Sequence, residues 1–443
     1  MNRKSSDDAY VWAKPTIPNP SSTTGPSRNS RANRSRSMSS GRARCGRPGG
    51  IADLSRATEV APVGRSRNHE RMRLVAWLSL AVLLFLIADT ASARAQPAVQ
   101  AGAALERREF VIRGFRTESG VVLPEARVVY ATLGTLNARG DNAILLPSHY
   151  MANFNGYNWL IRGADPNRVL DPARDFLILT ELFGNGRSTS PSNTPEPFHG
   201  PRFPVTTIRD NVEAVHRLVT TELGVKHLRA VVGFSMGAEQ AFQWAVSHPD
   251  FMDAIVATSG TAKCYGHGYV RLEGQISALT TDPAWQGGDY TTPPARGLEA
   301  FGMVWAGWLY SQEWWRQELW RTNSPAGTTF EQAVEGFRRR FGAYANNYIL
   351  QARTWQRHDV GTTPGFDGSV EKALRSIKAR VLYMPSETDL YFPIGDARYE
   401  QALIPRVTFT PIPSLWGHTA GAASNPADLR FLNDRIAAFL NSK

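Results

Sequence analysis

Residues 228–245 constrain the fold of this chain more than any other segment. An apolar run at residues 228–232 predicts a short buried strand, the turn G-F-S-M-G follows at residues 233–237, and apolar side chains then recur at helical spacing to residue 245. A strand, a G-x-S-x-G turn and a helix together indicate a nucleophile elbow, in which strained backbone presents the Ser235 hydroxyl at the helix N-terminus. Because so short a pattern also arises by chance, the rest of the chain has to provide an acid and a histidine, in that order.

Short apolar segments on both sides of the elbow predict the other strands of a sheet. They lie at residues 110–115, 126–130, 143–146, 176–182, 254–258, 380–384 and 407–411, with Gly120 as a hairpin signal between the first two. Residues 208–222 form an amphipathic helical pattern, and a last helix begins at Asn425-Pro426 and runs to about Asn441. Strands that alternate with helices predict an α/β fold, with a mostly parallel sheet and helices on both of its faces.

Residues 261–368 contain no clear buried strand and have a helical pattern. This segment holds seven of the twelve tryptophans of the chain. They are Trp285, Trp305, Trp308, Trp314, Trp315, Trp320 and Trp355. We interpret the segment as a helical lid inserted between two strands of the sheet. Two or three of its tryptophans are expected at a substrate pocket, and the others in the interior of the lid.

An acid and a histidine follow the elbow in the order that an α/β-hydrolase fold requires. Asp389 comes just after the strand at 380–384 and is our choice for the acid, with Glu387 as the alternative. His418 is the only one of nine histidines that follows this acid, and it lies just after the strand at 407–411. His418 would remove the proton of Ser235 as a general base, while Asp389 would orient the imidazole and stabilise its cation.

The developing oxyanion needs two backbone N–H donors. One is expected from Met236, which follows the nucleophile, and the other from the loop after the third strand, near Tyr150 or Met151. The pattern calls for no cofactor and no metal ion.

The N-terminal segment is interpreted separately from the folded domain at residues 105–443. Residues 1–71 are rich in Ser, Arg, Gly and Pro, and are expected to be disordered. They are either an RNA-binding or sorting arm or, as we favour, sequence upstream of the true start. Residues 72–95 resemble a secretory signal, with a basic start, an apolar run at 74–88 and the cleavage site Ala93-Arg94-Ala95. The protein is therefore expected to be secreted or periplasmic, and anchoring in a membrane by residues 74–88 is the alternative.

Charge and cysteine content exclude other classes of function. Residues 1–95 hold 16 Lys and Arg against 6 Asp and Glu, so the remainder, at 50 less 16 and 39 less 6, holds 34 basic and 33 acidic residues. The net charge of +11 therefore belongs to the leader, and the domain is not expected to bind nucleic acid. Once a leader that contains Cys45 is removed, Cys264 has no partner for an intramolecular disulfide.

With these residues placed, the chain resembles the homoserine O-acetyltransferase family of α/β-hydrolases, roughly over residues 108–440. The segments that carry the resemblance are residues 130–137, 142–145, 183–192, 203–210, 235–237 and 282–290.

Two positions depart from that family. The acetyltransferases have an aspartate directly after the catalytic histidine, where this chain has Thr419. They also have an arginine in the lid just after a Gly-Leu pair, whereas here Gly297-Leu298 is followed by E-A-F-G. Since a buried substrate carboxylate needs such a partner, the departures imply the branch of the family that is similar to esterases, with water as the acyl acceptor.

The leading hypothesis is a serine esterase that cleaves small acyl esters, of the acetyl type, through an acyl-enzyme intermediate. The alternatives are an acyltransferase that moves an acyl group from a thioester to an alcohol such as homoserine, and a binding protein that has lost catalysis. We expect a small-molecule ester as the partner, no nucleic acid, and no stable membrane association after signal cleavage; a homodimer is left open.

Overall fold

The computed structural model describes residues 105–163, 165 and 167–442 of the chain. The chain divides into two compact units, Met1–Ser92 and Ala93–Lys443, and the description below concerns the second. The expectations for residues 1–71 and 72–95 fall outside the described residues. None of the described helices is both long enough and apolar enough to cross a membrane.

An eight-stranded sheet forms the centre of this unit, in the order β1-β2-β4-β3-β5-β6-β7-β8. The strands are β1 Arg108–Arg116, β2 Val122–Leu133, β3 Ala143–Pro147, β4 Phe176–Thr180, β5 Ala230–Phe234, β6 Ala254–Thr258, β7 Arg380–Met384 and β8 Val407–Phe409. The pairs β1–β2 and β2–β4 are antiparallel, and all the pairs from β4 to β8 are parallel. The predicted mostly parallel sheet is therefore confirmed, as is the hairpin around Gly120.

Some element boundaries differ from the expected ones by about two residues. The strand predicted at 228–232 is β5, which continues to Phe234 because Gly233 and Phe234 pair with the end of β6, while Leu228 makes only an isolated bridge to Met252. The helix predicted at 208–222 is α1, Ile208–Arg217, followed by a π-helical turn at Leu218–Glu222. Apolar periodicity does not determine where a strand or an α-helix ends, since it indicates buried positions and not hydrogen-bond partners.

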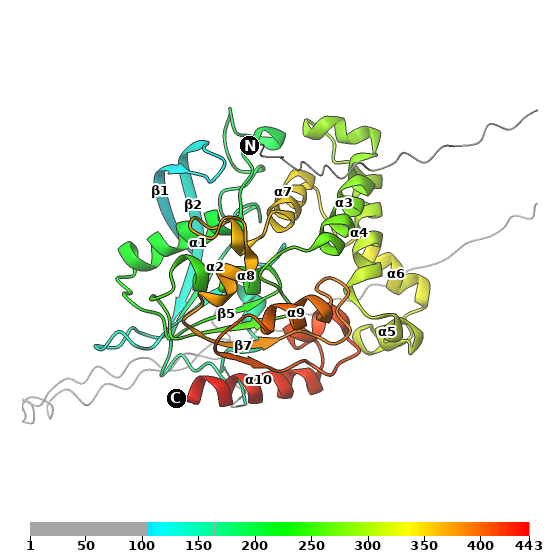
Figure 1. Ribbon diagram of the computed structural model, residues 1–443. Helices are drawn as coiled ribbons and strands as arrows, with labels where there is room; N and C mark the ends of the chain where they lie inside the picture. Colours follow the sequence, from blue (N-terminus) through cyan, green and yellow to red (C-terminus); the bar gives the residue numbers. More distant parts are fainter. Residues whose placement is uncertain (1–104, 164, 166, 443) are drawn as a thin grey trace, which may run out of the picture. The chain divides into compact units, whose positions relative to one another are not determined.

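Helices cover both faces of the sheet. The first helix, α1, and the helix after the elbow, α2 Met236–Ser247, lie on one face, and the last helix, α10 Pro426–Asn441, lies on the other (Figure 1). The central strands β3 to β6 are buried along their whole length, as expected of parallel strands that are covered on both faces.

Six α-helices lie between β6 and β7, where the lid was predicted. They are α3 Gly266–Thr280, α4 Ala295–Leu309, α5 Gln312–Arg316, α6 Phe330–Arg338, α7 Ala345–Gln356 and α8 Val370–Arg375. Trp314, Trp315 and Trp320 pack among aromatic rings of this segment, whereas Trp305 and Trp355 contact Tyr391 in the loop after β7. The helical content of the segment agrees with the prediction, and its action as a lid stays a prediction.

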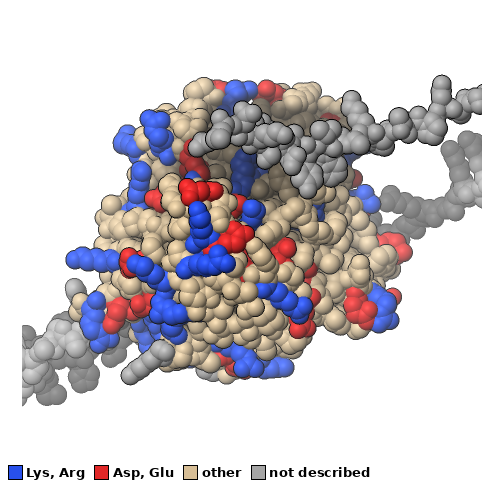
Figure 2. All heavy atoms as spheres, viewed as in Figure 1, with Lys and Arg blue, Asp and Glu red and all other residues tan. Residues whose placement is uncertain are grey.

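Charges of both signs are mixed on the surface. On the face drawn in Figure 2, Lys and Arg side chains lie among Asp and Glu side chains. Many form local ion pairs, such as that of Arg202 with Glu196 and Asp289. This distribution agrees with the near-neutral charge that the sequence gives for residues after the leader.

The start of α10 is built as the sequence indicates. Asn425 is in extended conformation and its side chain accepts hydrogen bonds from the N–H groups of Ala427 and Asp428, while Pro426 occupies the first helical turn. These contacts satisfy two N–H groups that the helix itself leaves without acceptors.

We predict that Asn425→Ala lowers the free energy of unfolding by about 1 kcal/mol, because both N–H groups lose their acceptor. Urea denaturation measures the change. Asn425→Ser is the matched control, since a serine also caps a helix and should keep most of the stability. An Asn425→Ala protein as stable as the unsubstituted protein would show that the cap contributes nothing.

Candidate active site

Ser235 lies at a sharp turn between the end of β5 and the start of α2. Its backbone has φ 57° and ψ −127°, a conformation that residues other than glycine seldom adopt. The neighbouring glycines explain how the chain turns so tightly. A Cβ on Gly233 would lie 2.0 Å from the carbonyl oxygen of Gly237, and one on Gly237 would lie 2.5 Å from that of Pro147. The structure thus confirms the strained turn that the G-x-S-x-G pattern predicts.

The structure brings Ser235, His418 and Asp389 into one hydrogen-bonded chain. His418 Nε2 lies 2.9 Å from Ser235 Oγ, and His418 Nδ1 lies 2.8 Å from Asp389 Oδ2. The residues are 2%, 4% and 4% exposed, respectively, so the chain is shielded from water. The arrangement can remove the proton of the serine hydroxyl and stabilise the imidazolium that results.

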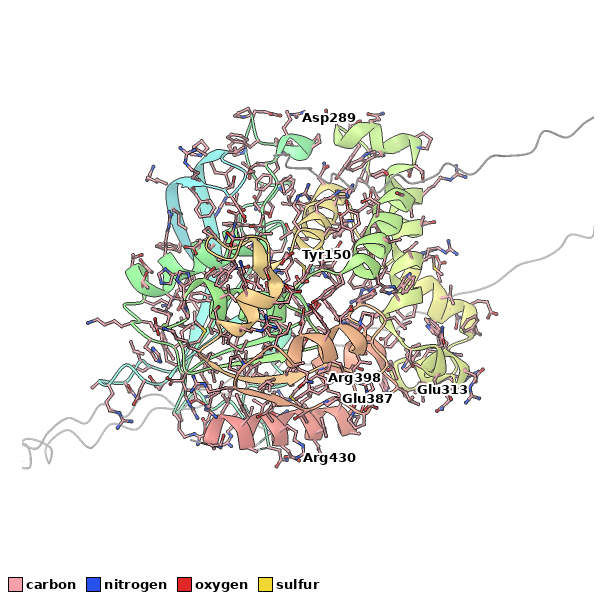
Figure 3. The ribbon with its side chains drawn as sticks, in the orientation of Figure 1. Tyr150, Asp289, Glu313, Glu387, Arg398 and Arg430 are labelled. Atoms are coloured by element: carbon pink, nitrogen blue, oxygen red, sulfur yellow. The ribbon has the colours of Figure 1, made fainter. Side chains whose placement is uncertain are left out.

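The geometry distinguishes between the two candidate acids. Asp389 is held in place because its Oδ1 accepts hydrogen bonds from the N–H groups of Tyr391 and Phe392, at 2.8 and 3.1 Å. Glu387 is exposed, and Figure 3 draws it in the lower part of the view, below the centrally placed Tyr150. Asp389, and not Glu387, is therefore the carboxylate that contacts His418.

Aromatic rings surround the His418 imidazole. The ring centroids of Phe234 and Tyr391 both lie 4.8 Å from that of His418, and Phe392 stacks on it at 5.5 Å. Trp305 and Trp355, from α4 and α7, pack in turn against Tyr391. These contacts exclude water from the imidazole and strengthen its hydrogen bonds to Ser235 and Asp389.

In the loop that was expected to complete an oxyanion hole, one backbone N–H group already has a hydrogen-bond acceptor. Met151 has a φ of 58°, and its N–H donates to Gln351 Oε1 at 2.8 Å. The Tyr150 hydroxyl donates to the carbonyl of Tyr348 at 2.9 Å. Gln351, on α7, is fully buried and its Nε2 donates to Phe183 O. Met151 could therefore stabilise an oxyanion only after its N–H leaves Gln351, and the roles of Met236, Tyr150 and Met151 stay predictions.

Buried ionisable groups near the triad were missed at the level of sequence. Glu239, one turn after Ser235 in α2, is fully buried, and desolvation together with Glu400 raises its pKa well above the usual range. Burial lowers the pKa of Arg271, on α3. Burial, followed by the charge of His418, lowers the pKa of His149 to about 3, so this ring is neutral at physiological pH. The one signal for Glu239 is a charged residue within the otherwise apolar start of α2.

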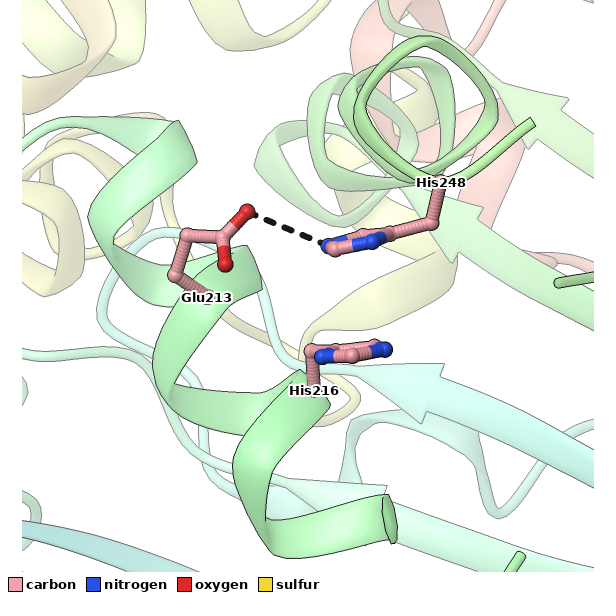
Figure 4. A group of neighbouring side chains, drawn as sticks. All are labelled: Glu213, His216 and His248. Carbon is pink, nitrogen blue, oxygen red and sulfur yellow. Dashed lines mark ion pairs between the residues drawn. The ribbon is translucent and has the colours of Figure 1, made fainter. Parts of the chain in front are cut away.

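Among the described residues, Glu213, His216 and His248 form a group whose ligand atoms all lie within 4.8 Å of one another (Figure 4). His248 Nε2 lies 3.1 Å from Glu213 Oε1, and the two imidazole rings are stacked, with centroids 4.0 Å apart and an angle of 6° between their planes. An imidazole nitrogen binds a metal through a lone pair in the plane of the ring. Two parallel rings, one above the other, cannot direct such lone pairs at one ion, so this arrangement does not fit a metal site.

Comparison with known proteins supports the fold. The profile of the alpha/beta hydrolase fold family matches residues 155–420. The chain is 37% identical over 332 residues to an ethyl acetate hydrolase of Pseudomonas veronii, covering 73% of this chain and 93% of that protein. It is 30% identical over 322 residues to a homoserine O-acetyltransferase of Trichormus variabilis, covering 69% and 87%.

A solved structure is similar over the same region. The acetyl esterase MekB matches with a TM-score of 0.72 and 35% identity, covering 76% of this chain and 97% of that one. The chain therefore belongs to the α/β-hydrolase family, in the group that contains acetyl esterases and homoserine O-acetyltransferases.

Proposed function

We propose that this protein is a serine esterase that hydrolyses small acyl esters, of the acetyl type, through an acyl-enzyme on Ser235. The observation that carries the proposal is the buried hydrogen-bonded chain from Ser235 through His418 to Asp389. That the chain is an ester hydrolase is further supported by its similarity to an ethyl acetate hydrolase and to a probable esterase of Corynebacterium glutamicum.

The first half of the reaction forms the acyl-enzyme. His418 Nε2 takes the hydroxyl proton as Ser235 Oγ attacks the ester carbonyl carbon, and the carbonyl oxygen becomes an oxyanion. The N–H of Met236, at the first position of α2, would donate to that oxyanion. The tetrahedral intermediate then breaks its bond to the alcohol oxygen, and the alcohol leaves with the proton from His418.

The second half releases the acid. A water molecule gives its proton to His418 Nε2 and attacks the acyl carbon, and the bond to Ser235 Oγ breaks as His418 returns the proton to the serine. Asp389 stays ionised and stabilises the imidazolium in both halves. The products are one carboxylic acid and one alcohol for each ester and water consumed.

The surroundings of the triad favour small acyl groups. Ser235 is only 2% exposed, and the rings of Tyr391 and Phe392 lie directly against His418. A long acyl chain would have to displace these rings or the tryptophans of α4 and α7 that pack on them. The names of the similar proteins, an ethyl acetate hydrolase and an acetyl esterase, agree with an acetyl group.

Acyl transfer to homoserine is the alternative, because homoserine O-acetyltransferases are among the similar proteins. The two positions that bind homoserine in that family argue against it. Thr419, in the position of the family's aspartate, donates its hydroxyl to the carbonyl of Trp416 and carries no charge. The residues that follow Gly297 and Leu298 in α4 include no arginine before residue 309. A zwitterionic acceptor would find neither charge partner at these positions.

The cellular site of this reaction is a further proposal. Export through the segment at 72–95 fits an enzyme that uses water and not an acyl thioester, since coenzyme A is not expected outside the cytoplasm.

We predict that kcat/KM for p-nitrophenyl esters is highest for the acetate and falls at least tenfold by the octanoate, because a longer chain collides with the rings around His418. Release of p-nitrophenol measures the rates. Acetyl-CoA and homoserine together should yield no O-acetylhomoserine above background. Efficient acetyl transfer to homoserine would contradict the proposed esterase function and support the alternative, an acyltransferase.

We also predict that Asp389→Asn lowers kcat by roughly 10³-fold or more, since an amide no longer fixes the tautomer or stabilises the imidazolium. Glu387→Gln is the matched control and should stay within twofold of the unsubstituted enzyme, because Glu387 is exposed. Steady-state kinetics on p-nitrophenyl acetate separates the two variants. If Glu387→Gln lost most of its kcat while Asp389→Asn kept nearly all of it, Glu387 and not Asp389 would be the catalytic acid.

A further inference from the structure

Arg271 is a buried cation, and one side of its guanidinium group has no hydrogen-bond partner. Its residue is 4% exposed, and its Nε and Nη2 atoms are buried without a hydrogen-bond partner. Its Nη1 has one long contact, 3.4 Å, to Gln275 Oε1. Nε and Nη2 form the side of the guanidinium that binds a carboxylate with two parallel hydrogen bonds, and leaving such donors buried and unpaired is costly.

Arg271 lies next to the proposed catalytic residues. Its guanidinium carbon is 4.1 Å from the ring centroid of Tyr391 and 4.6 Å from that of Trp355. Tyr391 is the same residue whose ring contacts His418. One aromatic side chain therefore connects the guanidinium to the catalytic imidazole. The cation–π contacts stabilise the charge but provide no acceptor for the N–H groups.

The carboxylates nearby do not accept hydrogen bonds from Nε or Nη2 of Arg271. Both oxygens of Asp389 are used by His418 and by the backbone of Tyr391 and Phe392. Glu239 has both oxygens without a partner, but it makes no ion pair with Arg271 within the described residues. Desolvation and Glu400 raise the pKa of Glu239 well above its usual range, and the charge of Arg271 only partly opposes this rise.

We propose that Arg271 determines substrate specificity by binding a carboxylate carried by the ester, through Nε and Nη2. The inference rests on the proposed esterase function and adds a substrate class: esters with a carboxylate on one half of the molecule. That carboxylate is either on the acyl half, as in a monoester of a dicarboxylic acid, or on the alcohol half, as in the acetyl ester of a hydroxy acid. Hydrolysis follows the same two steps, and the carboxylate itself does not react.

The test compares esters that are matched in size and differ in charge. Monoethyl succinate against ethyl butyrate tests the acyl half, and acetoxyacetate against propyl acetate tests the alcohol half. We expect one of the two carboxylate esters to be hydrolysed with kcat/KM at least tenfold above its neutral match. Arg271→Met should remove this preference through a rise in KM of tenfold or more, while the neutral esters stay within threefold.

Two further variants make the result specific. Arg271→Lys keeps the charge but not the two parallel donors, and should keep part of the preference. Arg353→Met on α7 is the matched control, because Arg353 is already paired with Glu273 and should not affect the ratio of charged to neutral rates. If Arg271→Met does not fold, competitive inhibition of ethyl butyrate hydrolysis by succinate and by glycolate, in the unsubstituted enzyme and in Arg271→Lys, provides the same comparison.

The outcomes separate this inference from the proposed function. An unsubstituted enzyme that prefers both neutral esters, or an Arg271→Met enzyme that loses charged and neutral substrates equally, would overturn the role of Arg271 and leave the esterase intact. An enzyme that hydrolyses none of the four esters would contradict the proposed function itself.

Discussion

The hydrogen bond between His418 and Ser235 depends on strand ends that are far apart in the sequence. Ser235 follows β5, Asp389 follows β7 and His418 lies after β8, and these strands are parallel, so all three chains leave the sheet at the same edge. The serine and the histidine are 183 positions apart in the sequence, and every helix of the inserted segment lies between them. Pairing of the strands is therefore what assembles the site, as is general for open parallel sheets.

Burial strengthens the site and also makes it costly. A hydrogen bond gains strength in a low-dielectric interior, but every buried polar atom then needs a partner. The triad meets this requirement, because Ser235 Oγ, both imidazole nitrogens of His418 and both carboxylate oxygens of Asp389 have hydrogen-bond partners. Glu239 and Arg271, a short distance away, do not. A buried polar group without a partner needs an explanation, and for Arg271 we propose a carboxylate of the substrate.

Sequence patterns were sufficient for the parts of the fold that local rules control. The elbow, the hairpin at Gly120 and the cap at Asn425 each depend on a few neighbouring residues, and the structure places all three as expected. Asp389 and Glu387 both follow the strand at 380–384, so their position did not distinguish them, and the structure now gives a contact with His418 as the reason to choose Asp389. The ends of β4, β5 and β8 were displaced by about two residues, because pairing with a neighbouring strand decides where a strand stops.

Contacts between distant segments could not be predicted in this way. The side chain of Gln351 holds Met151 N–H across 200 residues of sequence, and nothing in the pattern of α7 distinguishes it from any other helical glutamine. No sequence pattern indicated that Arg271 is buried, since only the packing of Trp355 and Tyr391 against it shows this. The contacts of α4 and α7 with Tyr391 likewise depend on how the inserted helices pack against the loop after β7, and tertiary contacts decide that packing.

Covalent labelling of the nucleophile tests the central claim most directly. A serine-directed phosphonate would be incubated with the unsubstituted enzyme and with Ser235→Ala, and the modified peptide identified by mass spectrometry. We expect one label per chain, on Ser235, in parallel with loss of esterase activity, and no label on a folded Ser235→Ala protein that is also inactive. A folded Ser235→Ala protein that keeps most of its esterase activity, or a label on a different residue, would contradict the proposed acyl-enzyme.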